Sequence, residues 1–142
     1  MNEQKNWVID ANIILRHVLK DLPEQAQKVD QIIAKAAGGS LKLFIPKPVV
    51  SDLVFVLSYM KVPKAEIAEA VRGWVSLPGV QLLGMDLLVL ETALDLFVEK
   101  NIKWSDALIS AKMLKWGFSI ICTFDKRFTR VPGLTMIDPL KV

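Results

Sequence analysis

Cysteine and histidine are almost absent from this 142-residue chain, which contains one of each, Cys122 and His17. A single cysteine excludes an internal disulfide and any cysteine-rich zinc site, and it suits a reducing compartment. We expect Cys122 to be a small buried residue on a strand. We expect His17 to be a packed or surface residue rather than a catalytic base.

Long apolar runs are missing as well. No stretch approaches the roughly 18 residues that would span a bilayer, and residues 1–6 are polar, without an apolar signal segment. We therefore expect a cytoplasmic protein that does not enter a membrane. The chain also lacks internal repeats and Gly/Ser/Pro-rich linkers, so its length predicts one domain over residues 1–142.

Neither sign of charge is in large excess. Eighteen Lys and Arg residues against fifteen Asp and Glu give a net charge of +3, which does not by itself identify a nucleic-acid-binding protein. The apolar fraction of 52% slightly exceeds the usual range of roughly 45–50%. Apolar residues are densest in residues 49–75, so we expect this segment to carry an apolar surface for a partner protein or a second subunit.

What the sequence does contain is an alternation of strand-like and helix-like segments. The expected strands are residues 7–9, 41–45, 80–83, 119–123 and 134–137, and the expected helices are residues 13–19, 23–37, 48–60, 63–74, 87–98 and 106–115. Asn12 and Ser105 are the expected N-caps of the first and last of these helices. The alternation predicts an α/β fold with a central, mostly parallel sheet of four to five strands sandwiched by helices.

Four aspartates interrupt apolar segments that should be buried: Asp10, Asp52, Asp106 and Asp125. A buried carboxylate without a partner is strongly destabilising, so each needs an explanation. Two of them follow predicted strands and two lie in the first turns of predicted helices, and these positions share one edge of an open α/β sheet. Any one of them could instead compensate a helix dipole or stabilise a turn. A single site explains all four together.

Carboxylates gathered at one edge repel one another unless a divalent cation compensates their charge. Oxygen ligands without a His or Cys pattern favour Mg²⁺ or Mn²⁺ over zinc. Such a site suits phosphodiester hydrolysis, because a bound metal ion lowers the pKa of a water molecule and neutralises charge on the phosphoryl oxygens. The chain has no Gly-rich phosphate loop and no G-x-S-x-G motif, which argues against nucleoside-triphosphate and acyl-transfer enzymes.

Four blocks of this sequence resemble the PIN-domain ribonucleases, and among them the VapC-type toxins of toxin–antitoxin pairs. The blocks are residues 8–16, 48–57, 105–111 and 123–128. The resemblance implies a Mg²⁺- or Mn²⁺-dependent endoribonuclease that forms a homodimer and is inhibited by a cognate antitoxin covering the acidic pocket. By match to these blocks, the metal ligands are Asp10, Asp106 and Asp125. The expected supporting residues are Asn12, Ser105 and Thr123.

Several cationic and aromatic residues flank the proposed site along the chain. Those expected to contact RNA phosphates are Arg16, Lys126, Arg127 and Arg130. Trp104 precedes Ser105 and Asp106, and it could stack on a base, although core packing is the interpretation that we favour.

Two positions depart from the family pattern. The family usually has Glu where this chain has Asp52, whose carboxylate is set back by about 1.5 Å, one covalent bond. It also often has Thr or Ser where this chain has Ala11. Two other functions therefore stay open: a catalytically weakened PIN-like RNA-binding or protein-interaction module, and a phosphotransferase in which Asp10 is a covalent nucleophile. Asn12 argues against the second, because such enzymes need an acid there as proton donor.

Overall fold

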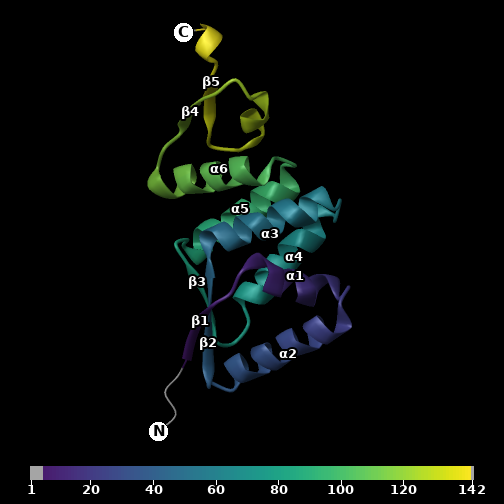
Figure 1. Ribbon diagram of the computed structural model, residues 1–142. Helices are drawn as coiled ribbons and strands as arrows, with labels where there is room; N and C mark the ends of the chain where they lie inside the picture. The colour runs from purple at the N-terminus through teal and green to yellow at the C-terminus, as the bar shows by residue number, and fades with distance from the viewer. Residues whose placement is uncertain (1–4, 142) are drawn as a thin grey trace. The chain divides into compact units, whose positions relative to one another are not determined.

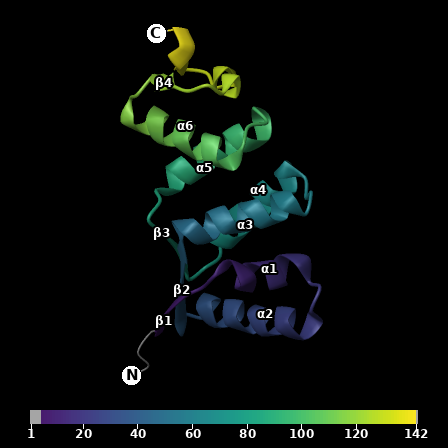
Figure 2. The same ribbon diagram turned by 45° about the horizontal axis from the view of Figure 1, so that its top comes forward.

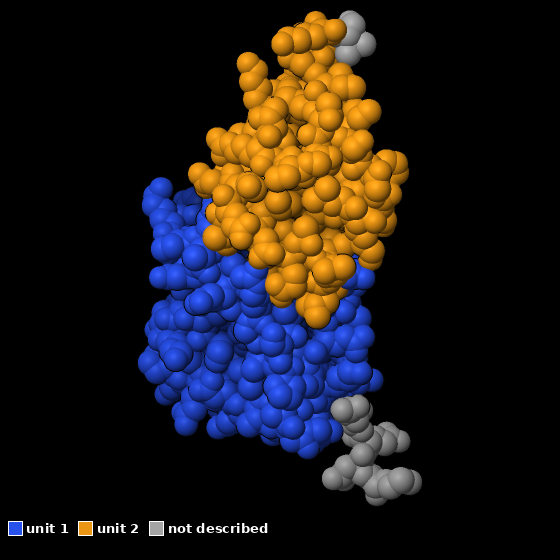
Figure 3. Space-filling view, turned by 180° about the vertical axis from the view of Figure 1, so that it is seen from behind, with its two compact units in different colours: residues 1–86 blue, residues 87–142 orange. Residues whose placement is uncertain are grey.

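The computed structural model describes residues 5–141, which belong to two compact units, residues 1–86 and residues 87–142 (Figure 3). Unit 1 contains β1 (Lys5–Val8), α1 (Ala11–Leu19), α2 (Pro23–Ala37), β2 (Leu41–Pro46), α3 (Lys47–Tyr59), α4 (Lys64–Val75) and β3 (Val80–Leu83). Unit 2 contains α5 (Leu87–Glu99), α6 (Trp104–Trp116), β4 (Ile120–Cys122), β5 (Thr135–Ile137) and the 3-10 helices η1 (Lys126–Arg130) and η2 (Pro139–Lys141).

No helix between residues 5 and 141 combines the length and the apolar character that crossing a membrane requires. The polar stretch at the N-terminus was expected to contain no signal segment. Its first four residues lie outside the described part of the chain.

The core of unit 1 forms around a three-stranded parallel sheet in the order β1-β2-β3 (Figure 1). Alternate side chains of the central strand β2, those of Leu41, Leu43 and Ile45, are at most 2% exposed. This two-residue period is typical of a strand with one buried face. Helices α1 and α2 lie side by side in both ribbon views (Figures 1 and 2). β2 leads directly into α3, which therefore starts at the carboxyl end of the sheet.

Unit 2 is built on the packing of α5 against α6 (Figure 1). Leu90, Leu94 and Phe97 of α5 are at most 2% exposed, and they repeat every three to four residues along one face. The Trp104 ring meets Phe97 edge to face, with ring centroids 5.7 Å apart. β4 and β5 pair in parallel as a separate two-stranded sheet.

The predicted α/β class is confirmed, with parallel strands and flanking helices. All five expected strands are present and every strand pair is parallel, but the hydrogen bonds divide them into sheets of three and two strands instead of joining them in one. Most helix boundaries also agree with the prediction. Helix α2 begins at Pro23 and ends before Gly38, and Pro46 and Pro63 are the N-caps of α3 and α4.

Three local predictions are wrong. The cap of α1 is Asp10, because its extended backbone lets its Oδ1 accept a hydrogen bond from the Ile13 N–H at 3.2 Å; Asn12 lies inside the helix. Helix α6 starts at Trp104, so Ser105 lies in its first turn and is not its cap. Cys122 is on a strand as expected, but its side chain is exposed because it lies on the open face of β4.

Candidate active site

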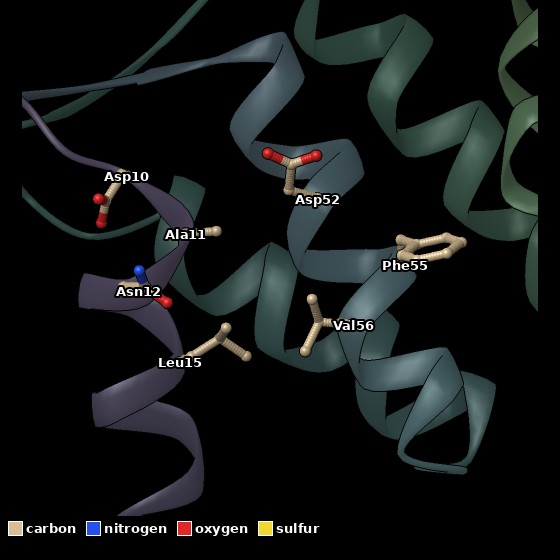
Figure 4. A pocket seen from close by; sticks show the side chains of 7 residues that line it. All are labelled: Asp10, Ala11, Asn12, Leu15, Asp52, Phe55 and Val56. Carbon is tan, nitrogen blue, oxygen red and sulfur yellow. The ribbon is translucent and has the colours of Figure 1, made fainter.

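Unit 1 places two of the predicted acids in the lining of one pocket. Asp10 follows β1 and caps α1, while Asp52 lies in the first half of α3. The pocket has a volume of about 310 Å³ (Figure 4). It is lined by Asp10, Ala11, Asn12, Leu15, Asp52, Phe55 and Val56. The start of α1 and one face of α3 therefore supply all of the lining residues, of which three are polar and four are apolar.

The side chains of this pocket divide into a polar and an apolar part. Figure 4 shows Asp10 and Asn12 on the α1 side and Asp52 on the α3 side, with Leu15 and Val56 pointing toward each other between the two helices. The two carboxylates point in different directions. One Asp10 oxygen is held by the Ile13 N–H. The pocket therefore offers two separate anionic groups above an apolar floor.

Unit 2 contains the other two predicted acids. Asp125 caps η1, and its Oδ1 accepts hydrogen bonds from the Arg127 backbone N–H at 2.9 Å and from the Arg127 Nε at 3.1 Å. The Asp125 N–H in turn donates to the Thr123 Oγ1 at 3.1 Å. The side-chain hydrogen bond from Arg127 is the main reason that the pKa of Asp125 is lowered. The carboxylate of Asp125 is thus ionised and held in place by its own loop.

Asp106, in the first turn of α6, is in the opposite electrostatic situation. Burial raises the pKa of its carboxyl, and the negative charge of Asp125 raises it further, while Arg127 and Lys103 partly offset the shift. The Asp106 Oδ2 is buried and has no hydrogen-bond partner. A buried anionic oxygen next to a second carboxylate is stabilised by a cation.

The carboxylates of Asp106 and Asp125, whose charges affect each other, fit a hard divalent cation, whereas those of Asp10 and Asp52 point in different directions. Mg²⁺ is usually bound through one or two carboxylates and keeps several waters, so a pair of aspartates is enough to hold it. Within residues 5–141, no three carboxylate, imidazole or thiol side chains come together as a metal-binding group. The acids are therefore brought together as two pairs, one in each unit, and the predicted cluster of four stays a prediction.

Three of the four cations predicted to contact RNA have partners within the protein. Arg16 forms an ion pair with Asp21, with 3.2 Å between its Nη1 and the Asp21 Oδ2. Arg130 donates from its Nη1 to the backbone carbonyl of Asn101 at 2.9 Å, and Arg127 binds Asp125. Lys126 is exposed. A role of these residues in RNA binding stays a prediction.

Other side chains near the acids have clearer roles than the sequence suggested. Trp104 is 9% exposed and packs on Phe97, which supports the core interpretation over base stacking. Two residues were not among those predicted from the sequence. Phe55 is 73% exposed and lines the pocket, and Ser110 is fully buried on α6. The signal was available, since the two residues lie three and four positions after Asp52 and Asp106.

Comparison with known proteins decides the family. The family model of the PIN domain matches residues 7–134. The chain belongs to the PIN-domain family. This PIN domain is also similar to a VapC ribonuclease of Aquifex aeolicus (strain VF5), with 24% identity over 134 residues that cover 93% of this chain and 96% of the relative.

A solved structure is similar as well: VapBC2 from Rickettsia felis bound to a DNA fragment from their promoter. The TM-score is 0.40 and the identity 15%, over 93% of this chain and 97% of that one. The resemblance to PIN-domain, VapC-type proteins inferred from the sequence is confirmed. The range matched by the PIN-domain model includes all four aspartates and runs through both units.

Proposed function

We propose that this PIN domain is a Mg²⁺- or Mn²⁺-dependent endoribonuclease and the toxin of a toxin–antitoxin pair. The observation that carries the proposal is the environment of Asp106, whose buried Oδ2 lacks a donor and lies near the charge of Asp125. The relative from Aquifex aeolicus, a VapC ribonuclease, supports RNA as the substrate. We further propose that Asp10, Asp52, Asp106 and Asp125 all contribute to catalysis.

In the proposed reaction the protein holds and orients charged groups, and no side chain acts as a nucleophile. A bound divalent cation supplies a water of lowered pKa and offsets charge on the phosphoryl oxygens. Asp106 and Asp125 are proposed to hold the cation together with Asp10, and Arg127 keeps the Asp125 carboxylate ionised and oriented. Thr123 fixes the backbone of Asp125.

The remaining assignments are supporting roles. Asn12 lines the same pocket as Asp10, where its amide can bind a phosphate oxygen of the substrate. Ser105 precedes Asp106 in the first turn of α6, where backbone N–H groups favour an anion. The proposed contacts to RNA phosphates come from Arg16, Lys126, Arg127 and Arg130. Lys126 and Arg130 are both exposed, and Arg130 also donates to the backbone carbonyl of Asn101.

The test is cleavage of a mixed RNA panel by purified, antitoxin-free protein in Mg²⁺, Mn²⁺ or EDTA. We expect cleavage in the presence of metal, none in EDTA, and loss of cleavage in Asp10→Asn and Asp106→Asn. Glu99→Gln is the matched control, because Glu99 is an exposed acid at the end of α5. Cleavage that persists in EDTA, or in both aspartate variants, would contradict the proposal.

A second candidate, a weakened PIN-like binding module, is favoured by Asp52. Its carboxylate points in a different direction from that of Asp10 (Figure 4). Its side chain is one methylene shorter than the Glu that the family usually has there. The two candidates are separated by Asp52→Glu. If the natural protein binds Mn²⁺ and RNA without cutting, and Asp52→Glu restores cleavage, the protein is a binding module. Cleavage by the natural protein excludes that reading.

The proposed antitoxin has a candidate surface on α3. Phe55 and Tyr59 are 73% and 82% exposed and lie four residues apart on one side of the helix. Met60, the C-cap residue of α3, is 50% exposed. Because Phe55 also lines the pocket, a partner that covers this surface would also cover Asp10 and Asp52. Co-expression with a small protein encoded in the adjacent reading frame tests the partnership. Tyr59→Ser should weaken inhibition and leave cleavage by the free protein unchanged.

Three further assignments stay proposals. We propose that the protein forms a homodimer, that it is cytoplasmic, and that both units work as one domain. Sedimentation analysis tests the first and cell fractionation the second. The third predicts that neither unit expressed alone is active.

A further inference from the structure

Two buried oxygens without hydrogen-bond partners lie one turn apart on α6. The Ser110 side chain is fully buried, and its Oγ has no partner; the Asp106 Oδ2 is buried and has none either. In residues 5–141 the only other buried side-chain nitrogen or oxygen without a hydrogen-bond partner is the Arg16 Nε, which is in unit 1. The coincidence on α6 therefore calls for an explanation.

The Ser110 hydroxyl lacks the backbone hydrogen bond that some other hydroxyl side chains in or at the ends of the helices make. Inside a helix, Ser and Thr usually donate to the carbonyl of the residue four positions earlier. Ser76, the C-cap residue of α4, does so to Arg72 at 2.6 Å, and Thr92 inside α5 does so to Leu88 at 2.9 Å. The Ser110 hydroxyl makes no such bond, although it is excluded from solvent. Its donor is available to another acceptor.

The Asp106 carboxylate lies one helical turn before Ser110 and offers an acceptor, although the structure shows no direct hydrogen bond between Ser110 Oγ and Asp106 Oδ2. Residues four apart on a helix are neighbours on one face, with Cβ atoms about 5–6 Å apart, so a hydroxyl and a carboxylate there can bond directly or through one water. The backbone N–H and the Nε of Arg127 are both bonded to Asp125, and Arg127 affects Asp106 through its charge. A donor from Ser110 would satisfy both buried oxygens at once.

We propose that Ser110 is a positioning residue, whose hydroxyl donates to the Asp106 carboxylate and holds it in the orientation that binds the divalent cation. The inference rests on the proposed function. A hydrogen-bond partner that orients a metal ligand usually affects metal affinity about 10- to 100-fold. Because Ser110 would act through Asp106, its removal should weaken binding of the cation more than it changes the reaction once the cation is bound.

The experiment is titration of the metal-free protein with Mn²⁺ by calorimetry, for the natural protein, Ser110→Ala and Ser76→Ala. We expect the dissociation constant to rise about tenfold in Ser110→Ala. Ser76→Ala removes a hydroxyl that has its usual backbone partner, and we expect it to bind Mn²⁺ like the natural protein. An affinity of Ser110→Ala within twofold of the natural protein would overturn the proposal.

Two further measurements separate positioning from a merely structural role. Raising the Mn²⁺ concentration should restore RNA cleavage by Ser110→Ala but not by Asp106→Asn, and the thermal unfolding of Ser110→Ala without metal should match that of the natural protein. If Ser110→Ala does not fold, Ser110→Cys keeps the volume with a weaker donor and should also bind Mn²⁺ less tightly. If the natural protein neither binds Mn²⁺ nor cuts RNA, the proposed function and the role of Ser110 are both refuted. If the natural protein is active but Ser110→Ala binds Mn²⁺ with unchanged affinity, only the role of Ser110 is refuted.

Discussion

Substitution of Gly79 by alanine should destabilise unit 1 without touching the proposed chemistry. Gly79 precedes β3 and has a φ of +81°, and a Cβ there would lie 2.5 Å from the carbonyl oxygen and 2.9 Å from the carbonyl carbon of Ala36, at the end of α2. Both are backbone atoms, so the contact can be relieved only by moving the helix end or the turn. The Gly79 carbonyl also accepts the Leu43 N–H of β2 at 2.8 Å, so the strand pairing resists that movement.

The expected loss can be worked out from three terms. The left-handed backbone costs a residue with a Cβ about 1–2 kcal/mol. Forcing an extra methyl into a packed site costs about 1–3 kcal/mol. The smaller entropy of the unfolded chain returns about 0.4–1 kcal/mol. Gly79→Ala should therefore lower the free energy of unfolding by about 3 kcal/mol.

Gly39→Ala is the matched control. Gly39 has a similar φ of +87°, but no atom lies within 4 Å of the Cβ position. Its substitution retains the backbone strain without the collision and should cost about 1 kcal/mol. The measurement is urea unfolding followed by circular dichroism. Equal losses in the two variants would show that the added Cβ at position 79 does not collide with the Ala36 carbonyl.

Three other predictions follow. Asp106→Asn should stabilise the metal-free protein at neutral pH, because burial and the charge of Asp125 raise the folded-state pKa of Asp106. The stabilising contribution of Asp106 is present below the ordinary aspartate pKa and is lost as the pH rises through the raised pKa, so the advantage of the variant in urea unfolding should shrink on acidification. A constant difference in the free energy of unfolding from pH 4 to 7 would contradict this prediction. Trp74→Phe should cost about 2 kcal/mol in the same assay, because it removes indole packing and the N–H donated to the His17 Nδ1 at 3.1 Å; an unchanged midpoint would show that this bond does not matter. Thermal unfolding of the whole chain should be a single transition if both units form one domain, whereas two separate transitions would refute that proposal.

Local patterns in the sequence predicted the elements and their order well. Prolines and glycines marked the ends of α2, α3 and α4, because these residues restrict or free the backbone whatever their surroundings. The caps were less certain. Asp10 and Asn12 are both good N-cap residues, and the choice between them depends on which one has the extended backbone.

In the candidate site too, the sequence predicted some features and the tertiary structure decided others. The residue types and their positions after strands and in helix first turns indicated which acids to consider. The sequence could not indicate that Arg127 binds Asp125 while the Asp106 Oδ2 is left buried without a donor. The same is true of Ser110, whose significance depends on its complete burial.

The sequence by itself therefore determined the α/β class, the succession of strands and helices, the family, and the set of acids on which a function can be based. These features follow from short-range periodicity, turn residues and motifs, all of which depend on residues close together in the sequence. Only the tertiary structure decided the division of the strands into two sheets, the hydrogen bond between His17 and Trp74 across 57 positions, and the opposite pKa shifts of Asp106 and Asp125. Burial, strand pairing and the distance between charges depend on residues that are far apart in the sequence, and only folding brings these residues together.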